Sequence, residues 1–315
     1  MDCARVTESV RLISTEALKV ATPDRSPSPW AKLPISIQAI LSGIVIALVA
    51  ANVWPLFLLN LSVPLAATAE AIFLGLYLWY VAGGGPPRTT QAARITAFRR
   101  GGLSPAQWFW AAIAAFFFAV TIHASIVLLF RLVHYPMAVF RHGYSLSFVP
   151  SLRLKWLAVL VSATSAGICE EVGFRGYMQR PIEQRHGAPI AISISSLFFM
   201  SLHLTKDWAT LGMVPIVFGA GVLLGLLAWS SRSLIPGMLG HTLMDIGLFA
   251  YWWTGIAGNF TEQPITETGI DRPFLVACSV FTLSLFMVLA AISKLRGRQA
   301  QILSGTLPTK RPTPD

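Results

Sequence analysis

Charged residues are scarce in this sequence of 315 residues: Asp, Glu, Lys and Arg together make up 12% of it, while hydrophobic residues make up 54%. A soluble domain of this size needs a polar surface that so few charges cannot supply. The mean hydropathy of +0.63 therefore excludes an ordinary soluble protein. It indicates a chain whose solvent is mainly lipid.

Cysteine is also rare, and acidic residues are fewer than basic ones. Cys3, Cys169 and Cys278 are too few and too widely spaced for a disulfide framework or a cysteine metal site. A net charge of +10 would suggest a nucleic-acid partner in a soluble protein. Here the basic residues lie mainly between long apolar runs, so we interpret them as topology signals and contacts with anionic lipid, and we expect no nucleic acid.

Long apolar runs are the dominant feature of the sequence. A membrane-spanning helix needs about 20 mostly apolar residues, and that length predicts an all-α, polytopic transmembrane helix bundle with about eight spans. A basic loop, 83–102, with a short amphipathic piece at 92–100, separates the second span from the third. The predicted spans are two within 33–81, with a turn between Asn52 and Pro64, then 106–132, 155–179, a fifth ending near 204, 210–230, 234–253 and 273–293.

The transmembrane domain is predicted at 33–294, between a polar N-terminal tail, 1–32, and a polar C-terminal tail, 295–315. The positive-inside rule favours cytoplasmic termini, because this orientation leaves few basic residues outside. It places the acidic loop with Glu262 and Glu267 on the outer side. We therefore expect a multi-pass integral membrane protein with both termini in the cytoplasm.

Two adjacent carboxylates in the fourth predicted span are the first candidate catalytic residues. Ionisable side chains inside a bilayer are costly, so each needs a structural or functional reason. Glu171 and Arg175 are spaced to pair on one helix face, while Glu170 points about 100° away. Arg175 can neutralise Glu171 and leave Glu170 to accept a proton from water. The Glu171–Arg175 pair can equally be a purely structural ion pair.

Histidines recur in the following spans at matching spacing. Phe199 and His203 share one helix face, and His241 and Asp245 share another. A hairpin that turns near His186 places Glu170 and His203 at similar depth. A base, two imidazoles and a dry environment can activate water and stabilise developing negative charge, which is the chemistry of amide hydrolysis.

These three motifs together resemble one protein family. Glu-Glu-x-x-x-Arg at 170–175, Phe-x-x-x-His at 199–203 and His-x-x-x-Asp at 241–245 are similar to the motifs of the CPBP (Abi) family, within a motif core at 150–250. That family includes the CAAX prenyl endopeptidases of the Rce type. The resemblance implies an intramembrane protease of the glutamic type that needs no cofactor.

The resemblance also implies a role for each matching residue. Glu170 would be the catalytic base, His203 would assist it, and His241 with Asp245 would stabilise the oxyanion. Glu171, Arg175 and Phe199 would support them. Family members commonly carry Asn at the last motif position, and a carboxylate donates no hydrogen bond unless protonated. Asp245 can therefore orient His241 instead.

Two alternatives follow from the same residues. Glu170, His203 and His241 form a His₂Glu set of the kind that binds catalytic zinc, although no His-Glu-x-x-His pair is present. A non-catalytic scaffold, immunity factor or ion-binding protein could use the same buried charges.

For the protease, the expected partners are the lipid bilayer and a membrane-embedded or lipidated peptide substrate. The sequence does not determine the oligomeric state.

Overall fold

The computed structural model describes residues 29–99, 101–135, 137–142, 145–206, 212–259 and 263–303. The chain divides into two units, Met1–Pro34 and Ile35–Asp315. The described part of the first unit contains the short helix α2, Pro29–Lys32. The amide of Leu33 donates to the carbonyl of Trp30 at its end.

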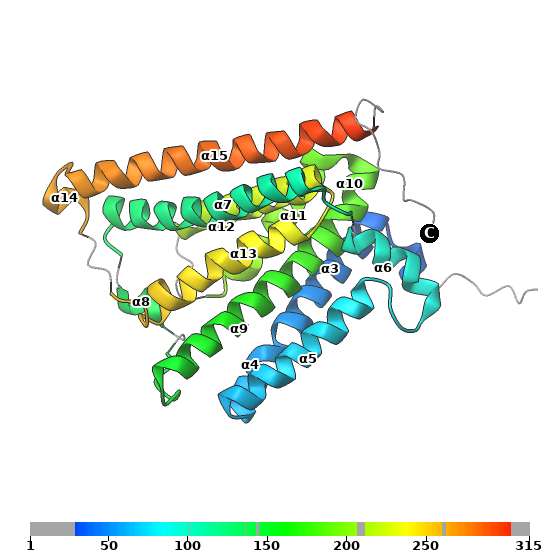
Figure 1. The fold of residues 1–315 in the computed structure, drawn as a ribbon, viewed down its shortest axis with the longest axis horizontal. Coiled ribbons are helices and arrows are strands. Elements are labelled where there is room, and N and C mark those ends of the chain that lie inside the picture. The colour runs from blue at the N-terminus through cyan, green and yellow to red at the C-terminus, as the bar shows by residue number, and fades with distance from the viewer. Residues whose placement is uncertain are drawn as a thin grey trace, which may run out of the picture. The chain divides into compact units, whose positions relative to one another are not determined.

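Helices make up all the secondary structure in the described part of the second unit (Figure 1), which confirms the all-α fold class. The first half contains α3 (Ile35–Ala51), α4 (Val53–Asn60), α5 (Val63–Val81), the 3₁₀ turn η1 (Arg88–Thr90), α6 (Gln91–Phe98), α7 (Pro105–Leu132) and α8 (Met137–Arg141). The second half contains α9 (Leu152–Glu171), the π-helix η2 (Val172–Gln179), α10 (Arg180–His186), α11 (Ala188–His203), α12 (Met213–Ser231), α13 (Ile235–Gly247), the π-helix η3 (Leu248–Trp253), α14 (Ile265–Thr268) and α15 (Arg272–Leu303).

Six helices in the described part of the chain are long and apolar enough to cross a membrane, so the predicted eight spans were an approximate count. The fifth predicted span is α11, an apolar helix of 16 residues. The seventh is α13, which has 13 residues and continues as η3. The six are Ile35–Asn60, Val63–Val81, Pro105–Leu132, Leu152–His186, Met213–Ser231 and Arg272–Arg296.

Local sequence signals set several helix ends. Ser104 and Gln107 form a reciprocal capping box at the start of α7, with Pro105 in the first turn. Gly187, at φ +83°, forms the turn between α10 and α11, which is the hairpin predicted near His186. At the other end of the chain, α15 continues to Leu303, so residues 295–303 extend the last helix rather than starting a tail.

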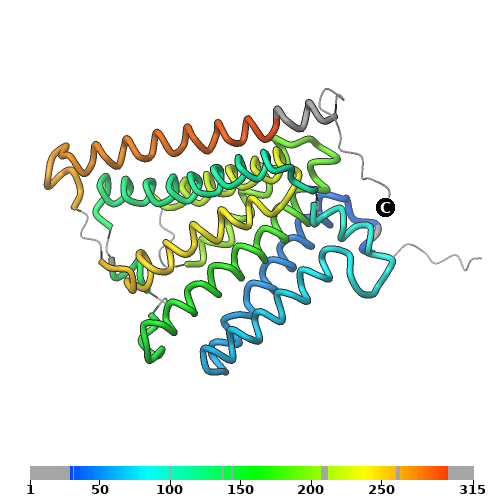
Figure 2. Tube along the Cα trace, in the orientation of Figure 1, coloured from blue at the N-terminus to red at the C-terminus, as the bar shows by residue number. Residues whose placement is uncertain are grey.

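The helices of the second unit pack around α9 and α13 (Figure 2). The α9 helix contacts α13, α3 and α5, and α13 also contacts α7. The α15 helix lies along α7, and η2 lies against α3 and α11. Backbone groups in hydrocarbon must bond within their own segment, so an apolar chain of this kind folds as packed helices.

Close helix approach around η2 depends on glycine. A Cβ atom on Gly173 would lie 2.6 Å from the Cβ of Ala47 in α3, and one on Gly176 would lie 2.9 Å from the carbonyl oxygen of Ala97 in α6. The α12 helix approaches its neighbours at Gly221 and Gly225, whose added Cβ atoms would lie 3.0 Å from Ser196 and from Gln179. Small residues thus bring the backbones together around the Glu-Glu-x-x-x-Arg motif.

Candidate active site

Glu171 is the most enclosed acidic group of the site. It is the last residue of α9, directly before η2, and its side chain is fully buried. Its Oε1 atom lies 3.0 Å from Nη1 of Arg175, which confirms the ion pair predicted from their spacing. Arg175 is also fully buried, donates through Nη2 to the carbonyl of Gly221 at 3.2 Å, and stacks 4.6 Å above the ring of Phe199.

His241 connects α13 to this ion pair. Its Nδ1 atom lies 3.0 Å from the same Oε1 atom of Glu171. An ionised carboxylate only accepts hydrogen bonds, so Nδ1 is the donor. A Cβ atom on Gly237, one turn earlier on α13, would lie 2.8 Å from Oε2 of Glu171. The absence of a side chain at Gly237 therefore gives Glu171 the space to reach the imidazole.

The other ring nitrogen of His241 faces two more carboxylates. Nε2 lies 3.6 Å from Oδ2 of Asp245 and 3.9 Å from Oε2 of Glu170. Three carboxylates therefore surround one imidazole. Asp245 approaches the ring at Nε2, while Glu171 fixes it at Nδ1.

Glu170 has the environment expected of a reactive carboxylate. It belongs to the same turn as Glu171 but lines a cavity, and its side chain is 19% exposed, whereas that of Glu171 is 0% exposed. Its Oε2 atom has no hydrogen-bond partner among the described residues. An oxygen in that position can accept a hydrogen bond from a water molecule or a substrate.

His203 completes the group from α11. Its Nδ1 atom lies 2.7 Å from the carbonyl oxygen of Phe199. That oxygen accepts, so Nδ1 donates and the neutral ring carries its lone pair on Nε2. The ring of Phe199 lies 4.7 Å from that of His203 and 5.8 Å from that of His241. Phe199 therefore positions both imidazoles as well as the Arg175 guanidinium.

The cavity in front of these residues has a volume of about 530 Å³ and is lined mostly by apolar side chains. Five of the seven residues that the sequence singled out line it: Glu170, Phe199, His203, His241 and Asp245. Glu171 and Arg175 lie behind them. The structure thus brings all seven candidates together. The five cavity-lining residues can contact a ligand, and Glu171 and Arg175 support them from behind.

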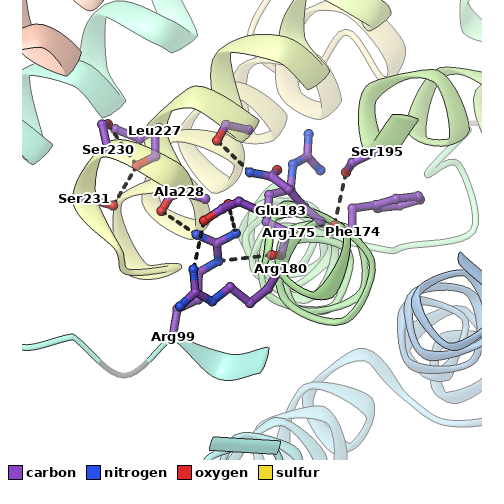
Figure 3. Close-up of polar contacts among 12 residues, drawn as sticks. Arg99, Phe174, Arg175, Arg180, Glu183, Ser195, Leu227, Ala228, Ser230 and Ser231 are labelled. Carbon is purple, nitrogen blue, oxygen red and sulfur yellow. Dashed lines mark hydrogen bonds and ion pairs between the residues drawn. The ribbon is translucent and has the colours of Figure 1, made fainter. Parts of the chain in front are cut away.

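A polar network closes the space behind the site (Figure 3). Arg99 donates to the carbonyl oxygens of Arg175 and Ala228 at 3.3 and 3.2 Å and pairs with Glu183 at 2.6 Å. Burial lowers the pKa of Arg99, and the carboxylate of Glu183 opposes this shift. Gln179 donates to the carbonyl of Gly225 at 3.0 Å. One backbone carbonyl of η2 and two of α12 therefore accept from the side chains of this network.

Two of the three motif helices change their winding, α9 within its motif and α13 shortly after its motif. Glu171 is followed by the π-helix η2, and α13, which carries His241 and Asp245, is followed by the π-helix η3. Such π segments are rare and occur frequently at functional sites, because they shift the side chains that follow relative to a regular helix. The sequence analysis did not predict either segment.

The zinc alternative finds no support in this geometry. Within the described ranges, no group of three His, Cys, Asp or Glu side chains is placed to hold one metal ion. The three proposed ligands therefore do not fit a zinc site as they are arranged.

Two polar residues outside the site form contacts between helices. His123 does form one, because it accepts from the indole of Trp252 at 3.0 Å. Glu70 of α5 accepts from Ser165 of α9 at 2.6 Å. The Glu171–His241 contact had no sequence signal, because it joins positions 70 residues apart on different helices.

The fold and the site define a multi-pass helical membrane protein with a buried cluster of carboxylates and imidazoles beside a cavity. Residues 152–247 match the family described as type II CAAX prenyl endopeptidase Rce1-like. This match confirms the resemblance to the CPBP family, and the family implies a membrane protease. No curated protein and no solved structure matches the chain.

Proposed function

We propose that this protein is an intramembrane endopeptidase of the glutamic type, which hydrolyses a peptide bond in a membrane-anchored or lipidated polypeptide. The observation that carries the proposal is the contrast between the two adjacent carboxylates. Glu171 is held by Arg175 and His241 at 3.0 Å each and is 0% exposed, while the side chain of Glu170 is 19% exposed and lines the cavity.

In this mechanism Glu170 removes a proton from a water molecule in the cavity. The resulting hydroxide attacks the scissile carbonyl carbon and forms a tetrahedral oxyanion. Glu170 then delivers the proton to the departing amine as the carbon–nitrogen bond breaks. His203 lines the same cavity as Glu170 and supports the first step by helping to orient the water.

Stabilisation of the oxyanion falls to His241. Its ring is fixed at Nδ1 by Glu171 and lies among three carboxylates. A protonated ring can donate from Nε2 to the oxyanion in an enclosed apolar space, where such a bond is worth far more than in water. Asp245 lies 3.6 Å from Nε2 and helps to orient the ring toward the oxyanion.

The test compares wild type with Glu170→Gln and His203→Ala, purified in detergent and treated with chelator, on a panel of membrane-anchored peptides. Glu70→Gln is the matched control, because Glu70 is a fully buried carboxylate of α5 that does not line the cavity. We expect Glu170→Gln to lose at least about 100-fold in kcat, the contribution typical of a general base. Glu70→Gln should retain activity.

Three outcomes decide between the alternatives. Full cleavage by Glu170→Gln would refute the glutamic mechanism. Loss of cleavage on chelation and its recovery with zinc would assign Glu170, His203 and His241 to a metal. If Glu170→Gln restores the cellular phenotype of a deletion as well as wild type does, the site belongs to a non-catalytic scaffold.

A further inference from the structure

The π-helix η3 determines which of two adjacent tryptophans lines the cavity. In a regular α-helix, with about 3.6 residues per turn, position 252 would lie within about 20° of both His241 and Asp245. Trp252 would then continue the cavity-lining face of α13, on which both motif residues lie. In the structure, however, Trp253 lines the cavity and Trp252 does not. A change of winding after Asp245 has therefore moved this face by one residue.

One turn of π-helix accounts for a shift of this size. Its backbone bonds join residue i to residue i+5, so a π turn contains about one residue more than an α turn. Leu248 and Phe249 begin η3 and line the cavity together with Trp253. A peptide in the cavity therefore meets Trp253, while the ring of Trp252 lies among aromatic residues of α7 and α8.

His123 of α7 binds Trp252 behind the cavity. The α7 helix packs along α13 (Figure 1). Nδ1 of His123 accepts from the indole Nε1 of Trp252 at 3.0 Å, and the ring also bonds to the backbone of Met244. A neutral imidazole has one donor and one acceptor, so Nε2 donates to the Met244 carbonyl. His123 itself does not line the cavity, whereas its neighbour Ile122 does.

The second bond of His123 lies where α13 passes into η3. The amide of Leu248 is shared there between the carbonyls of Met244 and Asp245. A Cβ atom on Gly247, the last residue of α13, would lie 2.6 Å from Cε1 of His123. The absence of a side chain at Gly247 therefore lets the imidazole reach the backbone. His123 supplies a donor at the point where the regular i+4 pattern ends.

Trp252 has a buried site of its own between α7 and α8. Its ring centroid lies 5.5 Å from that of Phe130 and 6.1 Å from that of Phe140. Its carbonyl accepts from Arg141 of α8 at 3.1 Å. Trp252 is only 2% exposed, so its indole N–H needs an acceptor within the protein, and His123 supplies one. The winding of η3 is thus tied to α7 through this hydrogen bond.

We propose that His123 is a positioning residue for substrate selectivity, because its bond to Trp252 keeps η3 in the winding that presents Trp253 to the peptide. This inference rests on the proposed peptidase function. Trp253 is 7% exposed, and its indole offers a large, flat apolar surface to a substrate side chain in the cavity. Without the acceptor at His123, the buried N–H of Trp252 loses its partner and the π winding loses its support.

The first test follows the position of residue 253 and needs no catalysis. The parent carries Cys3→Ser, Cys278→Ser and Trp253→Cys, and it keeps Cys169, which is fully buried and should not react. A small methanethiosulfonate reagent in detergent then labels position 253 from the cavity. Adding His123→Leu should lower the labelling rate about tenfold or more, since a buried donor left without its acceptor is costly and the winding that exposes position 253 is lost.

Two further variants and a matched control accompany this measurement. His123→Gln should keep the labelling rate within about threefold of the parent, because its amide both accepts and donates. Trp252→Phe removes the indole N–H and keeps an aromatic ring, so it should reproduce the loss. Thr121→Val is the control, because Thr121 bonds to Ser284 of α15 at 3.0 Å and not to η3. It should leave the rate unchanged.

The second test measures selectivity with Trp253 in place. Peptides that differ only in Leu or Ala beside the cleaved bond are compared for the wild type and the same variants. His123→Leu should reduce the preference for Leu in kcat/KM about tenfold, mainly through KM, because apolar packing of a few methylene groups has an effect of this size. His123→Gln should restore most of the preference. Combining His123→Leu with Trp252→Phe should add nothing further, because both remove the same bond.

An unchanged labelling rate in both His123→Leu and Trp252→Phe would overturn the proposal. An unchanged preference for Leu in these variants, or an equal effect of Thr121→Val, would do the same. Labelling does not depend on catalysis, so a failure of the Glu170→Gln test would refute the peptidase function and leave the labelling result unchanged.

Discussion

A single carboxylate oxygen, Oε1 of Glu171, lies 3.0 Å from Nη1 of Arg175 and 3.0 Å from Nδ1 of His241. The Arg175 contact lies within one continuous helical segment, whereas the His241 contact joins α9 to α13. Glu171 is therefore more than half of an ion pair, because it also sets the orientation of an imidazole that faces the cavity. A purely structural ion pair between Glu171 and Arg175 would not need the contact with His241, so this contact favours a functional role for Glu171.

Removing the pair in two steps should distinguish stability from catalysis. Arg175→Met leaves the Glu171 charge buried with its main partner lost, and we expect a fall of about 3–5 kcal/mol in the free energy of unfolding. The double variant Glu171→Gln/Arg175→Met removes both charges and should recover most of that stability. Its kcat should nevertheless fall about 10²–10⁴-fold, as when the carboxylate that orients a catalytic histidine is replaced by an amide.

Thermal unfolding in detergent and steady-state cleavage kinetics measure the two effects. A double variant with both wild-type stability and wild-type kcat would show that Glu171 and Arg175 form an ion pair with no catalytic role. A loss of kcat with unchanged KM supports a positioning role, because uniform loss of substrate binding would raise KM instead.

Asp245→Asn should retain activity within about tenfold of wild type, because the amide has the same shape and can donate to an oxyanion. Asp245→Ala removes the carboxylate beside His241 and supplies no donor in its place, and its kcat should fall about 100-fold, the magnitude typical of a lost oxyanion interaction. Comparing kcat for the two variants on one peptide checks this. Equal activity of Asp245→Ala and wild type would exclude Asp245 from the reaction.

Filling the cavity should impair substrate binding. Ala220 lines the cavity on α12 and is 3% exposed, while a Cβ atom on the neighbouring Gly219 would meet nothing within 4 Å. Ala220→Leu should lower kcat/KM about tenfold or more, mainly through KM, because the added side chain occupies space needed by the peptide. Gly219→Leu adds a similar volume outside the cavity and should change neither constant. Equal effects of the two substitutions would contradict the assignment of the cavity as the peptide site.

Acidification should weaken the α15 N-terminus. The amide of Phe274 and the guanidinium of Arg131 lower the pKa of Asp271, which lies just before the span. A carboxylate with a lowered folded-state pKa adds stability above its unfolded pKa of about 3.9, and this stability is lost as pH falls through the folded value. Asp271→Asn should therefore lower Tm at neutral pH but not at about pH 2. A pH-independent difference in Tm would contradict this.

The sequence alone determined the solvent of the protein, its all-α class and most of its helix positions. In lipid, apolar runs of about 20 residues can form all their backbone hydrogen bonds only as helices. The length and composition of the runs therefore predict the helical class. The Glu171–Arg175 pair and the turn after His186 were also predictable, because i,i+4 spacing and glycine act locally. The family motifs within 152–247 identified the candidate residues from the sequence, because each motif lies within one helical segment.

Only the tertiary structure decided what those residues contact. The Glu171–His241 hydrogen bond, the space that Gly237 provides and the position of Phe199 between two imidazoles all depend on the packing of separate helices. Spacing along one helix carries no information about the neighbour it meets, so contacts between helices come from the packed bundle.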